Sequence, residues 1–411
     1  MTGSLVSDDA IDFDPFAAEF HDDPHRVYRR LRAAAPVYHN PRYGFWALSR
    51  HADVVPAMKD FDTYSSGRGV TLEQVLAPEP PQQQIPMIIT MDPPEHTRMR
   101  KLVSAVFTPR AITALEPMIR ETIASFVERL DPERFDVVAD FSTLFPIEVI
   151  TTMLGVPRED RQQLREWLAI PLERAEGQVG IDEVARRAVK SSTEYYARLV
   201  AERRARPRDD MISRLLEVEV DREDGGLTRL TDREVLGFAA LLAGAGAETV
   251  AKVLGTATVI FADHPDQWRA LRADRSLIPG AFEELLRYEG PVQYDVRSTL
   301  REVTLHGSTI PAHSPVLMLL ASATRDPDAF PDADRFDITR PFTGNNLGLG
   351  YGIHRCLGAA LARLEGRIAL DAMLDFMPEY ELDRSGLRRA RVTSVAGWTN
   401  VPIRVHRDHG S

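Results

Sequence analysis

The sequence contains a single cysteine, Cys356, among its 411 residues. One cysteine excludes an intramolecular disulfide and any zinc or iron–sulfur site that is built from several thiolates. A lone thiol serves as apolar filler, as a nucleophile or as a metal ligand, so its neighbours have to distinguish these roles. Internal repeats, low-complexity tracts and linker-like segments are also absent. We therefore expect residues 1–411 to form a single domain.

Basic residues are the minority among the charges. The sequence has 50 Lys and Arg against 61 Asp and Glu, which gives a formal net charge of −11. An acidic chain is poorly suited to a nucleic-acid backbone or to an anionic membrane surface, so we expect neither partner. The first twenty residues lack both a basic segment and a long apolar run, as a signal peptide or anchor would require. We expect a monomeric, cytoplasmic protein.

Only one segment, Val235–Ala262, is apolar for a length that would span a bilayer. Glu248 and Lys252 interrupt it near its middle, and no residues at its ends are typical of an interfacial anchor. We interpret it as a buried core helix of roughly 40 Å, at about 1.5 Å per residue.

Helical periodicity dominates the rest of the chain, and strand-like alternation is confined to short segments. The pattern predicts a mainly α protein with a small β region. The expected helices are Pro24–Ala35, Pro94–Val106, Pro109–Leu130, Arg158–Leu172, Asp182–Arg204, Thr231–Ala262, His264–Ala273, Ile278–Tyr288 and Leu357–Met377. The expected strands are Tyr43–Leu48, Val296–Leu300, Val303–Leu305, Pro315–Leu319 and Val401–Val405.

The cysteine lies in a loop with four glycines, between Gly348 and Gly358. Glycines allow positive φ angles and a close approach of the backbone to a flat ligand. A helix is predicted to begin at Cys356, and its positive end together with Arg355 favours a thiolate, either as an iron ligand or as a nucleophile. The loop does not match the G-x-G-x-x-G pattern of a dinucleotide site.

A carboxylate and a hydroxyl stand side by side in the long apolar helix, at Glu248 and Thr249. Burial of a charge costs several kcal/mol unless the group is paired or used, which favours a function. Gly244 and Gly246 leave room beside the pair, and the Thr249 hydroxyl can bond a helix carbonyl and open the helix. The pair could therefore pass protons to a bound reactant. The alternative is that the Ala and Gly residues serve close helix packing and that Glu248 reaches a surface salt bridge.

The cysteine loop resembles that of the cytochrome P450 family, whose cysteine motif reads Phe-Gly-x-Gly-x-His-x-Cys-x-Gly. The matching positions here are Gly350, Gly352, His354, Cys356 and Gly358, and Leu349 stands at the phenylalanine position. The resemblance implies that Cys356 is the axial ligand of a haem b iron. It also implies that haem lies between the long central helix and the cysteine loop, against Gly350 and Gly358.

The long helix matches the same family, whose oxygen-activating segment reads Ala/Gly-Gly-x-Asp/Glu-Thr-Thr. Ala245, Gly246, Glu248 and Thr249 fit this pattern, and Val250 replaces the second threonine. The resemblance implies that Glu248 and Thr249 are catalytic and that Ala245 faces both haem and substrate.

His96 and Arg100 are four positions apart on a predicted helix, so both present donors on one face. Such donors suit an anion, and the haem carries two propionates. The alternative is a solvated basic helix face. The family pattern D-P-P-x-H-x-x-x-R matches this segment, and the resemblance adds Arg297 and His354 to the propionate ligands.

Glu284 and Arg287 are three residues apart on a predicted helix, which by itself indicates a surface ion pair worth about 0.5 kcal/mol. In the family such an E-x-x-R pair is buried and joined by a later arginine. The resemblance implies that Arg335 is this third, structural member.

The activity that the resemblance implies is a monooxygenase reaction, in which one atom of O2 enters a C–H or C=C bond. Ferredoxin and ferredoxin reductase would supply electrons from NAD(P)H. A basic patch would receive the ferredoxin, with the members Arg98, Lys101, Arg355, Arg363 and Arg367. The pocket for a large apolar substrate, such as a secondary metabolite, steroid, terpenoid or fatty acid, would include Val292, Tyr294, Trp398 and Ala245.

Two rival functions remain open from the sequence. A peroxide-driven hydroxylase of the same family would carry an Arg-Pro pair in the long helix, in place of Glu248 and Thr249. A non-catalytic haem sensor would need the thiolate but not the acid and alcohol.

Overall fold

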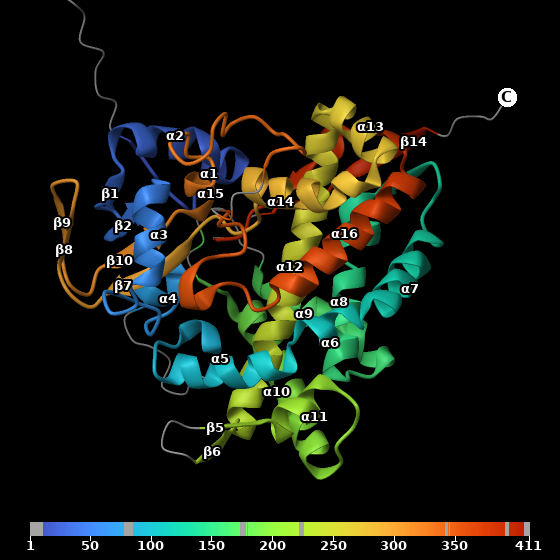
Figure 1. Cartoon of the computed structure of the whole chain (residues 1–411), viewed down its shortest axis with the longest axis horizontal. Coiled ribbons are helices and arrows are strands. Elements are labelled where there is room, and N and C mark those ends of the chain that lie inside the picture. The colour runs from blue at the N-terminus through green and yellow to red at the C-terminus, as the bar shows by residue number, and fades with distance from the viewer. Residues whose placement is uncertain are drawn as a thin grey trace, which may run out of the picture.

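Helices form most of the molecule, as the computed structural model in Figure 1 shows. The structure describes residues 11–77, 85–172, 178, 180–221, 226–341, 344, 346–390 and 394–406. Its α-helices are α1 (Ala18–Asp22), α2 (Pro24–Ala34), α3 (His51–Lys59), α4 (Leu72–Leu76), α5 (Glu95–Val106), α6 (Pro109–Thr113), α7 (Glu116–Val127), α8 (Phe145–Leu154), α9 (Arg161–Ala169), α10 (Glu183–Ala205), α11 (Met211–Glu217), α12 (Asp232–Asp263), α13 (Pro265–Ala273), α14 (Ile278–Glu289), α15 (Leu320–Ala323) and α16 (Ala359–Phe376).

The nine predicted helices are all present, with two corrections to their extent. The segment Arg158–Leu172 is α-helical only over α9 and has a 3-10 turn on each side. The segment expected as one helix over Pro109–Leu130 is broken into α6 and α7. Pro117 has no N–H to donate to the Thr113 carbonyl, so the α-helical ladder stops there. Helix α8 was not predicted, because most of its residues are buried and apolar on every side, which hides the helical period.

Helix α12 runs through the centre of the molecule. Its N-terminus carries a capping box, in which the Thr231 hydroxyl accepts from the Glu234 N–H and the Glu234 carboxylate accepts from the Thr231 N–H. It packs against α8, α10 and α16. Two segments, Val137–Leu154 and α12, are long and apolar enough to cross a membrane, but 67% and 50% of their most apolar windows are buried inside the fold.

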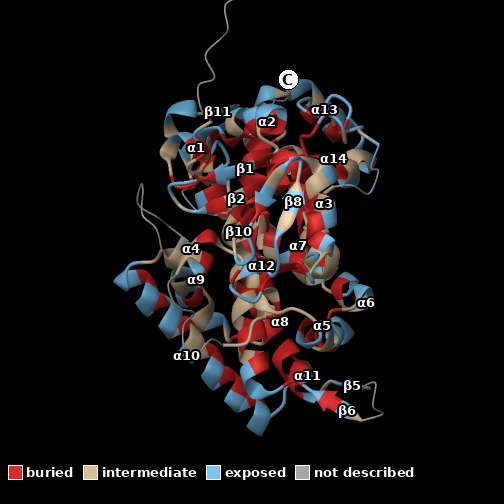
Figure 2. Cartoon of the chain, turned by 90° about the vertical axis from the view of Figure 1, so that its left-hand side faces the viewer, coloured by how far each residue is buried: buried red, intermediate tan, exposed pale blue. Residues whose placement is uncertain are grey.

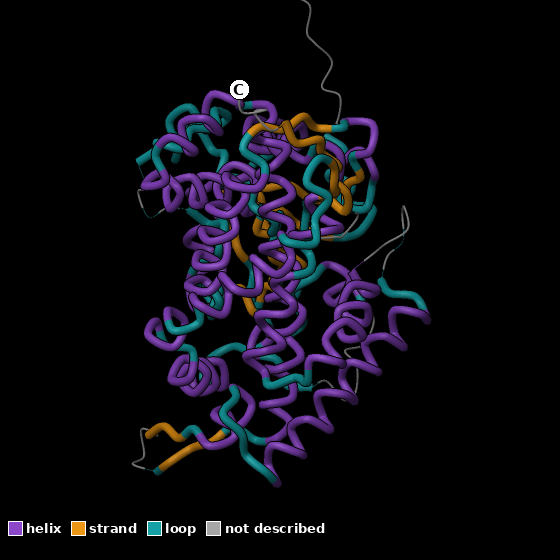
Figure 3. The backbone as a smooth tube through the Cα atoms, turned by 90° about the vertical axis from the view of Figure 1, so that its right-hand side faces the viewer, coloured by secondary structure: helices purple, strands orange, loops and turns teal. Residues whose placement is uncertain are grey.

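The strands gather mainly toward one side of the molecule, and a separate hairpin of β5 and β6 lies at the opposite end (Figure 3). The strands are β1 (Val37–Asn40), β2 (Phe45–Leu48), β3 (Tyr64–Ser65), β4 (Arg134–Asp136), β5 (Glu219–Asp221), β6 (Leu227–Arg229), β7 (Asp295–Thr299), β8 (Val303–Leu305), β9 (Ser308–Ile310), β10 (Pro315–Met318), β11 (Glu379–Leu382), β12 (Arg388–Arg389), β13 (Trp398–Asn400) and β14 (Pro402–His406). The five predicted strands correspond to β2, β7, β8, β10 and β14.

The largest sheet has the order β1-β2-β10-β7-β3, in which β2 and β10 are parallel and the other neighbours are antiparallel. A three-stranded sheet has the order β11-β14-β4, and β12 pairs with β13. Strand β14 thereby brings the end of the described chain against residue 134. Both sheets join segments that are far apart in the sequence.

Buried side chains are concentrated along the middle of the molecule, around α12, whereas the outer face of α10 is exposed (Figure 2). The largest cluster surrounds α8, α12, α14 and α16. A second cluster fills the space between the N-terminal helices and the large sheet, where Phe13, Tyr28 and Phe45 are fully buried. This arrangement confirms the expected mainly α class with a small β region.

Candidate functional site

The loop before α16 is shaped by two glycines in the left-handed region, Gly350 at φ 70° and Gly352 at φ 67°. A Cβ atom at Gly352 would lie 2.3 Å from the carbonyl oxygen of Met58, so no larger residue fits there. The loop closes on itself because the Cys356 N–H donates to the Leu349 carbonyl at 2.9 Å. The two positive φ angles confirm the expected tight turn, and the close approach at Gly352 is to Met58 of α3.

The Cys356 side chain is exposed, although protein atoms surround it closely enough to desolvate the thiol. Desolvation raises the pKa of the thiol, and the Gly358 N–H, Arg100, Arg363 and Arg355 oppose this rise. The rise prevails, so burial in the fold disfavours the thiolate form of Cys356. A bound metal ion would supply the missing stabilisation, since a coordinating thiol is deprotonated.

Ala245 is also exposed, although it stands in the middle of a helix whose other residues are mostly buried or half-buried. The exposed Ala245 marks an uncovered point on this face of α12. Three and four residues further on, Glu248 and Thr249 lie on the same side of the helix. The Thr249 hydroxyl donates to the Ala245 carbonyl at 3.1 Å, as expected for a residue that draws a carbonyl out of the helix ladder.

Four basic side chains from three parts of the chain meet beside the cysteine loop. The rings of His96 on α5 and His354 in the loop lie 4.5 Å apart between centroids. Arg100 on α5 donates to the Arg355 carbonyl at 2.7 Å, and Arg297 on β7 lies near His354. The structure therefore brings together all the residues that were expected to bind the propionates.

This cluster has the properties of a site for an anion. His96 Nε2 is buried without a hydrogen-bond partner. Desolvation, followed by the charges of Arg297, His96 and Arg100, lowers the pKa of His354 to about 3. Desolvation and the charge of Arg100 likewise lower the pKa of His96. A haem propionate would supply the acceptor that His96 Nε2 lacks, beside the charges of Arg100 and Arg297, so the residues present fit that group.

Glu248 is three-quarters buried, and its nearest cation is Lys252 on the next turn of α12. Lys252 Nζ lies 3.6 Å from Glu248 Oε2 and donates to the Trp398 carbonyl at 3.2 Å. The sequence had indicated Lys252 only as an interruption of the apolar segment. Its contact with β13 depends on a strand that lies about 146 residues further along the chain.

The structural triad needs one correction. Glu284 and Arg287 are buried and form a bidentate pair, with Nε–Oε2 and Nη2–Oε1 distances of 2.7 Å. The third member is Arg340, whose Nε donates to Glu284 Oε1 at 3.2 Å. The Arg335 side chain is 69% exposed and pairs with Asp337, so the prediction of Arg335 was wrong. Only the Arg335 backbone takes part, since its carbonyl accepts from Arg287.

The expected substrate-pocket residues separate into two groups. Val292 and Trp398 are half-buried, and the segments that carry them are joined by a bridge between Val292 and Val395. Tyr294 is fully buried in the cluster between the N-terminal helices and the sheet, with Tyr28 and Leu317. Its assignment to the pocket was therefore wrong, because side chains alternate across β7 and its approach, so that Tyr294 faces the sheet core.

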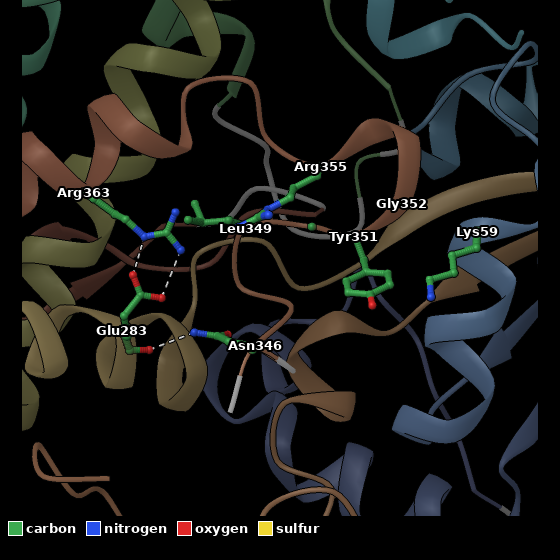
Figure 4. Close-up of a pocket in the computed structure, with 10 residues that line it drawn as sticks. Lys59, Glu283, Asn346, Leu349, Tyr351, Gly352, Arg355 and Arg363 are labelled. Carbon is green, nitrogen blue, oxygen red and sulfur yellow. Dashed lines mark hydrogen bonds and ion pairs between the residues drawn. The ribbon is translucent and has the colours of Figure 1, made fainter. Parts of the chain in front are cut away.

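On the outer side of the cysteine loop lies a cavity of about 420 Å³ (Figure 4). Lys59, Tyr351 and Arg355 line it, and the Lys59 ammonium lies 5.0 Å from the centroid of the Tyr351 ring. Of the expected basic patch, Arg363 is paired with Glu283 and Arg98 with Glu234, so both charges are balanced. Lys59 was missed, since only the fold brings α3 beside the loop.

The comparisons with known proteins agree with this geometry. The family model described as "Cytochrome P450" matches residues 179–376. A putative cytochrome P450 123 from Mycobacterium tuberculosis is 39% identical over 401 residues, which is 97% of this chain and 98% of that protein. A vitamin D(3) 25-hydroxylase from Pseudonocardia autotrophica is 39% identical over 398 residues, which cover 95% and 96% of the two chains.

Solved structures give the same result. Cytochrome P450 CYP109Q5 from Chondromyces apiculatus has a TM-score of 0.87 and 34% identity, over 97% of this chain and 100% of that one. The similarity to these relatives and to this structure extends over 95–97% of the chain, and it includes helix α12 and the cysteine loop. The chain belongs to the cytochrome P450 family of haem-dependent monooxygenases.

Proposed function

We propose that the chain inserts one oxygen atom from O2 into a C–H or C=C bond of a fairly large apolar molecule. For a C–H bond the balance is RH + O2 + 2 H⁺ + 2 e⁻ giving ROH and H2O. When bound, haem b supplies the binding and cleavage of O2. The observation that carries the proposal is the exposed Cys356 thiol together with the exposed Ala245 of α12, which stands beside the half-buried Glu248 and Thr249.

Cys356 would hold the iron as a thiolate, and Gly350 and Gly358 would keep the loop close to the haem plane. His96, Arg100, Arg297 and His354 would hold the propionates, which is supported by the unpaired His96 Nε2. The Cys356 thiolate would be stabilised further by its place before the N-terminus of α16.

Glu248 and Thr249 would deliver the two protons. The Glu248 carboxylate accepts a proton from water and passes it toward the Thr249 hydroxyl, which lies one residue further on α12. Thr249 would hold the proton at its Oγ1, beside the Ala245 carbonyl that it contacts at 3.1 Å. This acid and alcohol favour an O2-dependent reaction over a peroxide-driven one, and over a non-catalytic haem sensor.

The substrate would lie against Ala245, Val292 and Trp398, which offer a mainly apolar surface. Relatives support a bulky secondary metabolite or steroid-like molecule. One is named a vitamin D(3) 25-hydroxylase, another a cyclomarin C epoxidase, and a structure 33% identical to this chain was solved with erythromycin B.

Electrons would come from NAD(P)H through a ferredoxin reductase and a ferredoxin. The protein would work in the cytoplasm as a monomer, and its chain would form one domain. The ferredoxin would dock over the cavity lined by Lys59, Tyr351 and Arg355 (Figure 4). Arg367 lies outside this lining and is exposed, so it would extend the basic rim. Acidic partners are steered by such a rim in spite of the net charge of −11.

The first test is the spectrum of the dithionite-reduced protein with carbon monoxide. The wild type should show a strongly red-shifted Soret band, and Cys356→Ala should lose it while retaining the circular dichroism of the fold. A band at the shorter wavelength of a neutral axial ligand, or a band unchanged in Cys356→Ala, would reject the haem-thiolate proposal.

The second test is Thr249→Ala, assayed with a surrogate ferredoxin and reductase. Loss of the hydroxyl should divert electrons, so that the hydrogen peroxide released per NAD(P)H consumed rises by about one order of magnitude. Unchanged peroxide release would contradict the assignment of Thr249 and would favour a protein that carries haem without activating O2.

A further inference from the structure

A lysine is buried in the apolar core directly beside the acid of the proposed proton path. The Lys252 side chain is 7% exposed, and its neighbours Val250, Ala251 and Val253 are buried. A buried ammonium is costly unless its donors are satisfied, so its partners indicate its role. Neither the family match nor the proposed function assigns one to it.

The partners of Lys252 lie on two different elements. Its Nζ is 3.6 Å from Glu248 Oε2 on the preceding turn of α12, and it donates to the Trp398 carbonyl of β13 at 3.2 Å. Glu248 lies at the border between the core and the open face of α12, since its side chain is 23% exposed. The ammonium therefore connects the proposed proton donor with the strand that carries Trp398.

The β13 segment is shaped to receive the lysine. Gly397 has a φ of +152°, and a Cβ atom there would lie 2.8 Å from both Cβ and Cδ of Lys252. The lysine stem thus lies directly over a position where only glycine fits. The Arg389 guanidinium lies 4.0 Å from the centroid of the Trp398 ring, and the two residues pair across β12 and β13.

The same segment is fixed to the approach of β7. The Gln293 N–H donates to the Ser394 carbonyl at 2.8 Å, and the Ala396 N–H donates to the Pro291 carbonyl at 2.7 Å. These bonds enclose Val292, the other residue of the proposed substrate pocket. The segment 394–398, whose Trp398 carbonyl accepts from the Lys252 ammonium, is therefore part of the wall of the proposed pocket.

We propose that Lys252 is a positioning residue that holds the Glu248 carboxylate in one orientation for proton delivery, anchored by the Trp398 carbonyl and by the backbone at Gly397. The inference rests on the proposed role of Glu248 and adds the group that orients it. Because β13 also forms the pocket wall, the orientation of the acid is set by the same strand that contacts the substrate.

The first measurement is infrared spectroscopy of the reduced, carbon-monoxide-bound protein, which requires no turnover. The carboxylate band of Glu248 is the band that Glu248→Gln removes. Lys252→Met should shift and broaden this band, and Lys252→Arg should keep it narrow. Lys190→Met is the matched control, since Lys190 pairs with Glu194 at 3.9 Å across one turn of α10 but is exposed.

The second measurement is a double-mutant cycle in substrate-free turnover with a surrogate ferredoxin and reductase. We expect Lys252→Met to raise the peroxide released per NAD(P)H by about one order of magnitude, with Lys252→Arg close to the wild type. In the Glu248→Gln background, Lys252→Met should add nothing further. The red-shifted carbon-monoxide band of each variant verifies that the fold and the thiolate are intact.

The outcomes separate the two claims. If Glu248→Gln raises peroxide release but Lys252→Met changes neither the band nor the peroxide, the positioning role is rejected and the proposed function stands. Additive effects in the cycle would also reject it, because they indicate a purely structural lysine. If Glu248→Gln itself has no effect, the proposed role of Glu248 fails and the inference fails with it.

Discussion

At the scale of single residues, Glu284 is the centre of a buried charge cluster. Its two carboxylate oxygens accept from Arg287 and Arg340, and Oε1 also accepts the Asp337 N–H. Arg340 further donates to the carbonyls of Pro331, Asp332 and Arg335. The cluster therefore fixes the irregular segment 331–340 against α14 by donors that cannot be replaced by water without loss.

Arg340→Met should lower the free energy of unfolding by about 2 kcal/mol, because it removes one donor from the buried Glu284 carboxylate and one from each of three carbonyls. Arg335→Met is the matched control. It removes an exposed ion pair from the same segment and should change stability by less than about 0.5 kcal/mol. Urea unfolding followed by circular dichroism gives both values, and the reverse order would restore Arg335 as the third member.

At the scale of elements, the approach of α14 to α16 depends on Gly366. A Cβ atom at this position would lie 2.0 Å from the Phe282 ring, which is 1% exposed and has no room to move. Glycine in the middle of a helix costs roughly 1 kcal/mol relative to alanine. The close packing that positions the helix after Cys356 outweighs this cost.

Gly366→Ala should therefore destabilise the protein by about 2 kcal/mol in spite of the better helix propensity. Combining it with Phe282→Leu should cost less than the two single changes together, since the smaller side chain gives space. Gly244→Ala is the control on α12, where a Cβ would meet only Leu168 at 4.0 Å. That change should stabilise by about 0.8 kcal/mol, and a stabilising Gly366→Ala would contradict the packing argument.

At the scale of the whole molecule, Glu289 connects distant parts of the chain. His25 Nε2 on α2 and Arg325 Nη2 each lie 2.9 Å from its carboxylate, and Arg389 on β12 lies at 3.9 Å. Burial by itself would raise the pKa of Glu289, but His25, Arg325 and Arg389 outweigh it and lower the pKa from 4.5 to about 2. The cluster thus holds the N-terminal helices against the C-terminal strands.

This pKa gives a prediction for stability against pH. The folded value lies below the unfolded one, so the stabilisation is complete above about pH 4.5 and is lost as the pH falls toward 2. At about 1.4 kcal/mol per pKa unit, it amounts to about 3 kcal/mol. Glu289→Gln should be less stable than the wild type by this order at pH 7, and the difference should shrink below pH 4.5.

Urea unfolding at a series of pH values measures the difference, because urea does not screen charges. Glu302→Gln, at an exposed carboxylate with no ion pair among the described residues, serves as the control. A difference between Glu289→Gln and the wild type that stays constant from pH 7 to pH 3 would show that the carboxylate charge does not stabilise the fold.

The sequence predicted those features that follow from local spacing. The i, i+4 separation of His96 and Arg100 puts both on one face of α5, and the structure joins them with His354 as expected. Positive φ angles at Gly350 and Gly352 follow from the glycine pattern. The start of α12 was predicted correctly because the Thr231 capping box marks it, whereas the break that Pro117 marks between α6 and α7 was missed.

The amino-acid sequence alone determined the mainly α class, the cysteine loop and the acid–alcohol pair, because each depends on neighbours within one turn or one loop. Only the tertiary structure decided that Arg340 takes the place expected for Arg335, that Tyr294 faces the sheet core, and that Lys252 reaches β13. These contacts depend on which distant segments the packed core brings together, and spacing along the chain carries no record of that choice.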